Sequence, residues 1–440
     1  MRVAFVTPRY GREVVGGAES AARQLAEHLV ASTGWRTEVF TSTALDHLTW
    51  RSELEPGDQT MNGVLVHRFS PEAERSSKFY ELDGRIRLAP GHATREQAED
   101  WIDMNGPVTP RLVEALCASS ADVAAFYPYL YYPIVRAIGR VPMPAVLHPA
   151  AHDEPALYLP VFADTFASAD ALVFHTMAER RLVQRHYPVA GLPQLLLGLG
   201  TELSPARRRS GAEVLGSGDR PYVASVGRVD EHKGSKMLAA YFAEYKARRP
   251  GPLALALVGP VAYRPPRHPD VVLTGMVSDE DKYDVLRDAL ALVSPSALES
   301  FSLAVTEAWT LELPVVVNAR CGPTREHCER SGGGLWFGSY REFEAVLDRL
   351  VADAALRRSL GARGRRYVER HYRWPVLIER YARFLEEVSA RGKLSAEAVA
   401  ASVRGSEPAN RPVRAVAANA AASPGLNRRP SPPTLPPRRG

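Results

Sequence analysis

Residues 294–318 read SPSALESFSLAVTEAWTLELPVVVN, and the elements they encode set the class of the whole chain. The apolar run 291–293 ends in Ser294-Pro295, a pair typical of a turn. A helix is predicted from about Ser302 to Leu311, where a following proline stops it. The run Val315–Val317 is then predicted to be a buried strand. Strand, loop, helix and strand in this order form the repeating unit of a parallel α/β sheet.

The same alternation of short apolar runs and helix-length segments continues to about residue 370. Such alternation predicts parallel sheets covered by helices on both faces. The predicted strands fall into two sets, Val3–Thr7, Thr37–Phe40, Val64–Arg68, Val123–Phe126, Ala145–Leu147, Ala171–Phe174 and Gln194–Leu197, then Tyr222–Val226, Leu253–Val258, Val271–Leu273, Ala291–Val293 and Val315–Asn318. Two sets predict an α/β chain of two doubly wound, Rossmann-like domains. Ligands of such sheets bind at the carboxyl ends of the strands, so the expected site is the cleft between the domains.

Composition sets limits on the class of protein. The chain has 440 residues, 45% hydrophobic and 24% charged, which is typical of a globular enzyme. No run of 18 apolar residues is present, and the first strand begins too early for a signal peptide, so we expect a cytoplasmic protein. The three cysteines fit no metal spacing and agree with a reducing compartment.

The basic charge is concentrated at the C-terminus. The net charge is +5, and residues 391–440 contain nine Lys or Arg against two Glu, so the rest of the chain is slightly acidic. This distribution gives no support to nucleic-acid binding. The segment is rich in Pro, Ala, Ser and Arg, and we expect a disordered tail that acts as a solvated spacer. Contact with acidic lipid, as a peripheral protein at the inner membrane face, is the alternative.

Two glutamates, Glu299 and Glu307, stand on either side of the predicted helix start. The first backbone N–H groups of a helix lack intrahelical partners and attract anions. Ionised carboxylates accept hydrogen bonds from hydroxyl groups, so the arrangement suits a polyhydroxylated ligand that carries phosphate. By themselves, two glutamates are more often solvated charges.

The whole pattern of residues 294–318 resembles the signature of the family 4 retaining glycosyltransferases, members of the glycosyl transferases group 1 with the GT-B fold. The resemblance implies that Glu307 holds the ribose hydroxyls of a nucleotide sugar and Glu299 the sugar hydroxyls. It also implies that the donor contacts Ser300, Phe301, Ser302 and Leu303 at the helix start. Ser302 stands where many members have glycine, and serine can also cap a helix start.

A glycine pair, Gly16-Gly17, follows the first strand and precedes a helix. Glycines let the backbone approach a ligand closely, although a tight turn is the default explanation. Gly-Gly-Ala-Glu resembles the first-loop motif of the same family, whose backbone touches donor phosphate and acceptor. There is no G-x-G-x-x-G fingerprint, which argues against a nicotinamide enzyme.

Two cations follow the first strand of the second domain, Arg228 after a glycine and Lys233 before one. Arg offers a planar fork for phosphate oxygens and Lys a compact charge. As isolated residues they would be surface charges, but their order resembles the diphosphate clamp of the family.

Histidines follow the predicted strand Ala145–Leu147. His152-Asp153 resembles the family position whose histidine contacts the transferred sugar, whereas His148 is expected to be structural.

Met276 and Val277 resemble the family segment whose backbone contacts the nucleobase. Asp279-Glu280-Asp281 formally gives Asp-x-Asp, a metal-binding pattern, but capping of a helix from Ser278 explains it. The aromatic run 126–132 is expected to pack in the core, with a sugar-stacking or membrane-facing surface as the alternative.

The resemblance covers about residues 1–390 and implies five parts: an acceptor-binding domain 1–202, a linker 203–219, a donor-binding domain 220–371, a helix 372–390 that crosses back, and the tail. It implies a retaining transfer of a hexose from a UDP- or GDP-sugar to a glycan or lipid-linked acceptor, with His152, Arg228, Lys233 and Glu299 as catalytic residues. No metal cofactor is expected. A sugar-nucleotide epimerase or hydrolase, and a non-catalytic sugar-nucleotide-binding module, remain alternatives.

Overall fold

A computed structural model describes residues 1–14, 16–202 and 205–393 of the chain. The predicted tail lies outside the described residues from position 394 on. The helices, including the short 3-10 helices η1 and η2, are α1 Gly17–Thr33, α2 Lys78–Leu88, η1 Pro90–His92, α3 Arg95–Asn105, α4 Pro110–Cys117, α5 Tyr132–Ala137, η2 Pro155–Tyr158, α6 Val161–Ala167, α7 Met177–His186, α8 Gly211–Leu215, α9 Ser235–Arg248, α10 Asp279–Asp288, α11 Leu303–Thr310, α12 Gly322–Ser331, α13 Tyr340–Ala352, α14 Ala354–His371 and α15 Trp374–Arg391.

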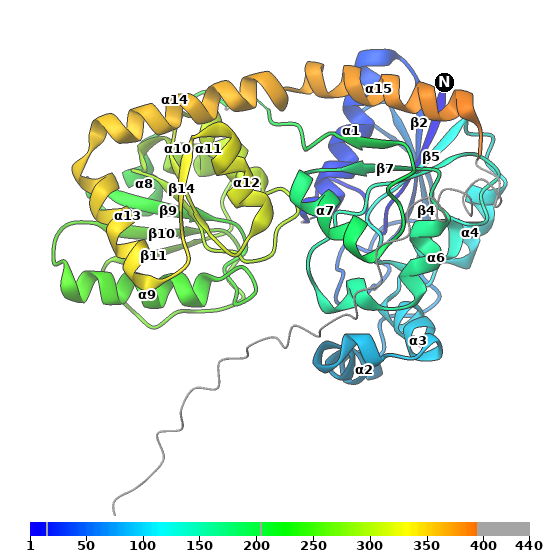
Figure 1. The fold of residues 1–440 in the computed structure, drawn as a ribbon, viewed down its shortest axis with the longest axis horizontal. Helices are drawn as coiled ribbons and strands as arrows, with labels where there is room; N and C mark the ends of the chain where they lie inside the picture. Colours follow the sequence, from blue (N-terminus) through cyan, green and yellow to red (C-terminus); the bar gives the residue numbers. More distant parts are fainter. Residues whose placement is uncertain (15, 203–204, 394–440) are drawn as a thin grey trace, which may run out of the picture. The chain divides into compact units, whose positions relative to one another are not determined.

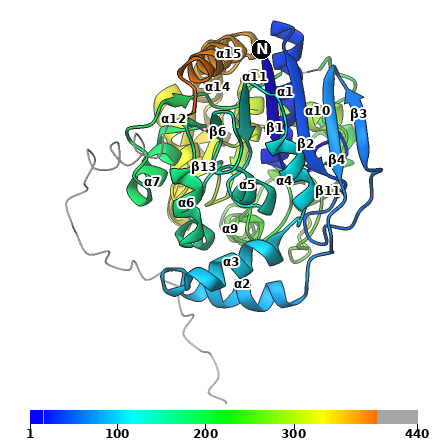
Figure 2. The same cartoon turned by 90° about the vertical axis from the view of Figure 1, so that its right-hand side faces the viewer.

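The first domain is built on an eight-stranded sheet with the order β3-β4-β2-β1-β5-β6-β7-β8. Its strands are β1 Arg2–Val6, β2 Arg36–Ser42, β3 Gly57–Met61, β4 Val64–Phe69, β5 Val123–Phe126, β6 Ala145–Leu147, β7 Ala171–Phe174 and β8 Gln194–Leu196. Figure 2 shows β1, β2, β4 and β3 side by side, with α1 alongside them. The order places β1 at the centre, so the loop that follows β1 opens at the middle of the carboxyl edge of the sheet.

One strand departs from the predicted all-parallel sheet. β3 is antiparallel to β4 and joins it through Asn62-Gly63, both with positive φ, as in a two-residue hairpin turn. Its sequence, GDQTM, is largely exposed at the sheet edge and lacks the apolar pattern of the buried strands. The prediction missed it because an edge strand need not bury its side chains.

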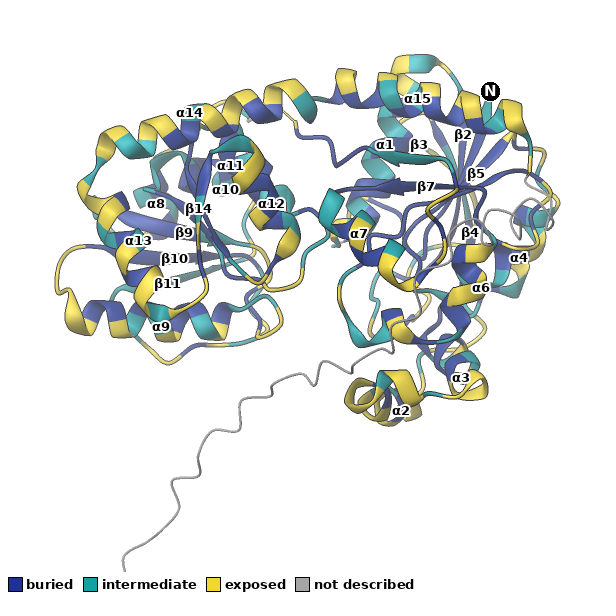
Figure 3. Ribbon diagram, viewed as in Figure 1, coloured by how far each residue is buried: buried dark blue, intermediate teal, exposed yellow. Residues whose placement is uncertain are grey.

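The second domain has a six-stranded, all-parallel sheet with the order β11-β10-β9-β12-β13-β14. Its strands are β9 Tyr222–Val226, β10 Ala254–Val258, β11 Val271–Gly275, β12 Leu292–Ser294, β13 Val315–Asn318 and β14 Gly334–Phe337. Helices flank both sheets, and Figure 3 shows buried residues along the strands and exposed residues on the outer helix faces (Figures 1 and 3). The predicted class, two doubly wound Rossmann-like domains, is therefore confirmed.

The final helix, α15, belongs in sequence to the second domain but packs on the first. It starts with a proline in its first turn and buries a stripe of apolar and aromatic residues. Tyr381 donates or accepts a 2.9 Å hydrogen bond with Nε2 of the fully buried His148, and Arg380 donates to the carbonyl of Leu196. The predicted crossing-back helix is confirmed, and His148 helps to hold this helix against the first domain.

Part of the segment predicted to link the domains is folded. Ser210 and Glu213 form a capping box at the start of α8, and the buried Asp284 of α10 accepts backbone N–H groups of Arg208 and Arg209. The exact boundary of each domain stays a prediction. Among the described residues, no helix combines the length and apolar character needed to cross a membrane.

Candidate functional site

A cavity of about 380 Å³ is lined by residues of both domains at the carboxyl ends of their central strands. It contains most of the residues predicted to act on a nucleotide sugar: Gly16, Gly17, His152, Arg228, Lys233, Glu299, Ser300, Phe301, Ser302 and Leu303. The chain thus gathers, in one hollow, loops that are up to nearly 300 positions apart in sequence.

The cations of the second domain are held by a short turn after β9. Asp230 binds the Nε of Arg228 with one carboxylate oxygen and accepts the Lys233 backbone N–H at 2.6 Å with the other. The Lys233 Nζ donates to Oε1 of Glu299 at 2.7 Å. Gly234 has φ 77°, and a Cβ at this position would lie 2.6 Å from the Pro295 carbonyl oxygen. Glycine therefore lets the turn that carries Lys233 pack closely against the loop that carries Glu299. Both cations therefore face the loop that leads into α11.

A second cavity, of about 220 Å³, lies between these cations and the helix start. Gly17, Gly227, Arg228, Lys233, Ser302 and Leu303 are among its lining residues. A hollow bounded by two cations, backbone and a helix N-terminus suits a diphosphate.

At the start of α11, serine does not take the capping role that its residue type allows. Ser302 has φ 78° and ψ 88°, in the left-handed region, and its side chain makes no capping hydrogen bond. Its backbone has a conformation that glycine adopts more easily than serine.

The two first-loop glycines differ in their surroundings. A Cβ on Gly16 would lie 2.2 Å from Oε2 of Glu19, whereas Gly17 has no neighbour within 4 Å of such an atom. Glu19 is buried in an ion pair with Arg9, whose Nε donates to Oε1 at 3.0 Å. A side chain at Gly16 would displace the Glu19 carboxylate, whereas Gly17 leaves its backbone open to the cavity.

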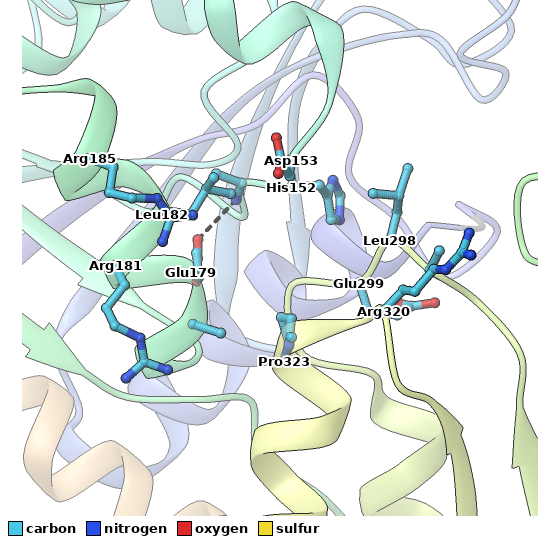
Figure 4. A pocket seen from close by; sticks show the side chains of 14 residues that line it. His152, Asp153, Glu179, Arg181, Leu182, Arg185, Leu298, Glu299, Arg320 and Pro323 are labelled. Carbon is cyan, nitrogen blue, oxygen red and sulfur yellow. Dashed lines mark hydrogen bonds between the residues drawn. The ribbon is translucent and has the colours of Figure 1, made fainter. Parts of the chain in front are cut away.

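His152 stands at the junction of this cavity with a third one, of about 330 Å³, which Glu299 also lines (Figure 4). Its Nδ1 lies 3.5 Å from Oε1 of Glu154. Burial alone lowers the pKa of His152, but the Glu154 and Glu299 carboxylates more than offset this, and the net shift is upward. The ring therefore holds a proton more readily than an ordinary histidine.

Three predicted residues do not line these cavities: Glu307, Met276 and Val277. Glu307 accepts a 3.0 Å hydrogen bond from Lys282 of α10. The Met276 side chain is 63% exposed, and Val277 packs against the core. Ser278 caps α10 by accepting the Asp281 N–H, which confirms the capping explanation of the acidic triplet.

Other lining residues were not predicted. Tyr127, His175 and His47 line the larger cavity, and Glu179 the third one. The aromatic run 126–132 was expected in the core, and Tyr127 and Tyr129 are fully buried, but Tyr127 also faces the cavity. Their position in the sequence could have identified two of them, since Tyr127 directly follows β5 and His175 directly follows β7.

Residues 208–367 match the family of glycosyl transferases group 1. The second domain is a group 1 glycosyltransferase domain. Over 166 residues the chain is 26% identical to glycosyltransferase 1 domain-containing protein 1 of Xenopus tropicalis, an alignment that spans 36% of the chain and 48% of that relative. The predicted resemblance to the glycosyl transferases group 1 is thereby confirmed for the second domain.

Solved structures show that the fold is GT-B over most of the chain. Sucrose-phosphate synthase from Thermosynechococcus elongatus superimposes with a TM-score of 0.65 at 18% identity, over 89% of this chain and 99% of that one. An Escherichia coli trehalose-6-phosphate structure bound with UDP-2-fluoro glucose gives 0.65 at 11% identity over 88% and 99%. An Anabaena protein in complex with UDP and glucose gives 0.61 at 14% identity over 88% and 100%. At these identities the chain shares only the architecture with them.

Proposed function

We propose that the protein is a family 4 retaining glycosyltransferase that moves a hexose from a nucleoside diphosphate sugar to a hydroxyl of a glycan or lipid-linked acceptor. The observation that carries the proposal is the shared cavity, in which Arg228 and Lys233 of the second domain meet Glu299, His152 and the Gly16-Gly17 loop. Two of the similar structures hold UDP or a UDP-sugar analogue, which favours a UDP-sugar as the donor.

The chemical difficulty is the negative charge that develops on the departing diphosphate. In this proposal Arg228, Lys233, the start of α11 and the backbone at Gly17 stabilise that charge, and the cavity that they line supports these roles. A single preorganised donor of this kind typically contributes about 10²–10³ in rate. The Lys233–Glu299 pair would open so that the Nζ turns to phosphate and the carboxylate to sugar hydroxyls.

In the transfer step the bond from the anomeric carbon to the diphosphate oxygen breaks and a bond from that carbon to the acceptor oxygen forms on the same face. The acceptor proton passes to an oxygen of the leaving phosphate. His152 would hydrogen-bond the transferred sugar, and we assign no separate general base or metal.

A thermal-shift screen against UDP-, GDP- and ADP-sugars tests donor binding. A true donor at 100 times its dissociation constant stabilises the protein by about 2.7 kcal/mol. Arg228→Ala should lose that shift while retaining the melting temperature of the free protein. Product analysis by NMR then tests whether the anomeric configuration is kept.

The rival functions give different results in the same assay. An epimerase or hydrolase consumes the donor at full rate with no acceptor present, whereas a transferase is slow until an acceptor is added. A non-catalytic module shifts in melting temperature but consumes no donor under any condition.

A further inference from the structure

A buried carboxylate lies behind the loop that carries His152. Glu179, in the first turn of α7, is 1% exposed. Its Oε1 accepts the Ala151 backbone N–H at 2.9 Å, and its Oε2 accepts the His175 backbone N–H at 2.7 Å. Figure 4 shows the first of these bonds, with His152 directly beyond it. One side chain therefore ties together the loops that follow β6 and β7.

No Lys or Arg in the described part of the chain neutralises this carboxylate. The His175 ring has its Nδ1 3.5 Å from Oε2 of Glu179, and burial lowers the pKa of that histidine to about 3, so it is neutral. Burial raises the pKa of Glu179 to about 7. An ionised carboxylate is costly to keep at such a buried position. The two backbone hydrogen bonds that it accepts offset only part of that cost.

The loop that Glu179 holds is under backbone strain. Ala150 has φ 51°, in the left-handed region, which costs a non-glycine residue roughly 1–2 kcal/mol. The chain then passes Ala151 and reaches His152, whose carbonyl accepts the Glu154 N–H at 2.9 Å. A strained turn keeps its shape only where its surroundings fix it, and the Ala151 N–H is fixed by Glu179.

We propose that Glu179 is a positioning residue of the transfer site: through the Ala151 N–H it sets where His152 stands between the two cavities. The inference rests on the proposed function in giving His152 a role in the transfer. Both carboxylate oxygens are needed, one for each backbone donor. In Glu179→Gln the amide keeps one acceptor, and its NH₂ group faces the other N–H.

Asp284→Asn is a matched control. Asp284 is also fully buried, and its Oδ2 accepts the backbone N–H groups of Arg208 at 3.1 Å and Arg209 at 3.0 Å. It lines neither of the cavities that contain His152. In Asp284→Asn the amide oxygen keeps both backbone donors, and the NH₂ group faces Arg287, whose Nη1 donates to Oδ1 at 2.7 Å. Both variants place an amide NH₂ against a donor at a buried position, but only Glu179 lies behind the His152 loop.

The first measurement is amide hydrogen exchange by mass spectrometry of a peptide covering 148–154. Glu179→Gln should speed exchange there by about tenfold, the effect of losing one backbone hydrogen bond, and Asp284→Asn should leave it unchanged. Unchanged exchange in Glu179→Gln overturns the proposal whether or not the protein is active. If Glu179→Gln fails to fold, Glu179→Asp, which retracts the carboxylate by one methylene, carries the same comparison.

The second measurement is the rate with the donor found by the screen. Glu179→Gln should lower kcat by about 10- to 100-fold, as a misplaced catalytic contact does, while the donor KM stays within about threefold. Asp284→Asn should change neither. Faster exchange with unchanged kcat overturns the link to transfer, whereas a wild-type protein that consumes no nucleotide sugar counts against the proposed function alone.

Discussion

The loop before α11 and α11 itself each carry a glutamate that pairs with a lysine at nearly the same distance but in different surroundings. Lys233 Nζ lies 2.7 Å from Glu299, and Lys282 Nζ lies 3.0 Å from Glu307. The Lys233 side chain is 41% exposed and lines the shared cavity, but that of Lys282 is 16% exposed and lies outside it. The first pair borders a hollow that a ligand can enter; the second lies between α10 and α11.

The contrast shows that one ion-pair chemistry serves two purposes. An exposed pair contributes little to stability, so the Lys233–Glu299 pair can separate at small cost when an anion arrives. Lys282 is different: burial lowers its pKa, but Glu307 and Asp279 outweigh burial and raise it. A ribose bound to Glu307 must therefore share the carboxylate with a firmly charged lysine.

Removing each lysine gives the largest expected difference. Lys233→Ala should lower kcat/KM by about 10²–10³, because it deletes a donor to the departing diphosphate. Lys282→Ala should lower it by less than about tenfold, since Lys282 touches no part of the cavity. Initial rates of nucleoside diphosphate release measure both. Equal losses of kcat/KM in the two variants would show that the position of Lys233 in the cavity gives it no special role in transfer.

Removing each glutamate charge tests whether Glu307 binds the ribose and Glu299 binds the transferred sugar. Glu307→Gln should weaken UDP binding by about tenfold, the effect of replacing a charged acceptor of hydroxyl groups. Glu299→Gln should leave UDP affinity within about twofold, because UDP lacks the sugar that Glu299 is proposed to hold. Isothermal titration with UDP makes the comparison. A UDP affinity unaffected by Glu307→Gln would remove the ribose role.

The comparison also marks what could be predicted from the sequence. Gly-Arg after a strand and Glu299 before a helix could be placed, because the carboxyl ends of parallel strands meet at one edge of the sheet. The order of apolar runs was enough to predict the parallel strands of two sheets, and the family resemblance added the crossing of α15. These features depend on local pattern and on the topology that follows from it.

Contacts fixed by tertiary packing could not be predicted in this way. The bonds of Glu179 to Ala151 and His175 depend on how α7 meets two loops, and the partner of Glu307 lies 25 positions earlier on another helix. Serine is a residue type that can cap a helix, but Ser302 does not, because the turn sets the backbone conformation at that position.

The smallest expected effect concerns stability at the starts of two neighbouring helices. Ser302 has φ 78° and makes no capping bond, whereas Ser278 has φ −67° and accepts the Asp281 N–H at 3.1 Å. Ser302→Gly should stabilise the protein by up to about 1 kcal/mol, because relief of left-handed strain exceeds the added chain entropy of glycine. Ser278→Gly should destabilise it by a few tenths, about the loss measured when a capping serine becomes glycine.

The signs of the two changes are opposite, so melting temperatures measured side by side suffice. A loss of stability in Ser302→Gly would mean that the serine hydroxyl has a structural partner that its geometry does not indicate. If Ser302→Gly is stabilising yet lowers the rate of transfer, the strained serine serves the cavity that it lines, because strain kept at such a position is retained for function.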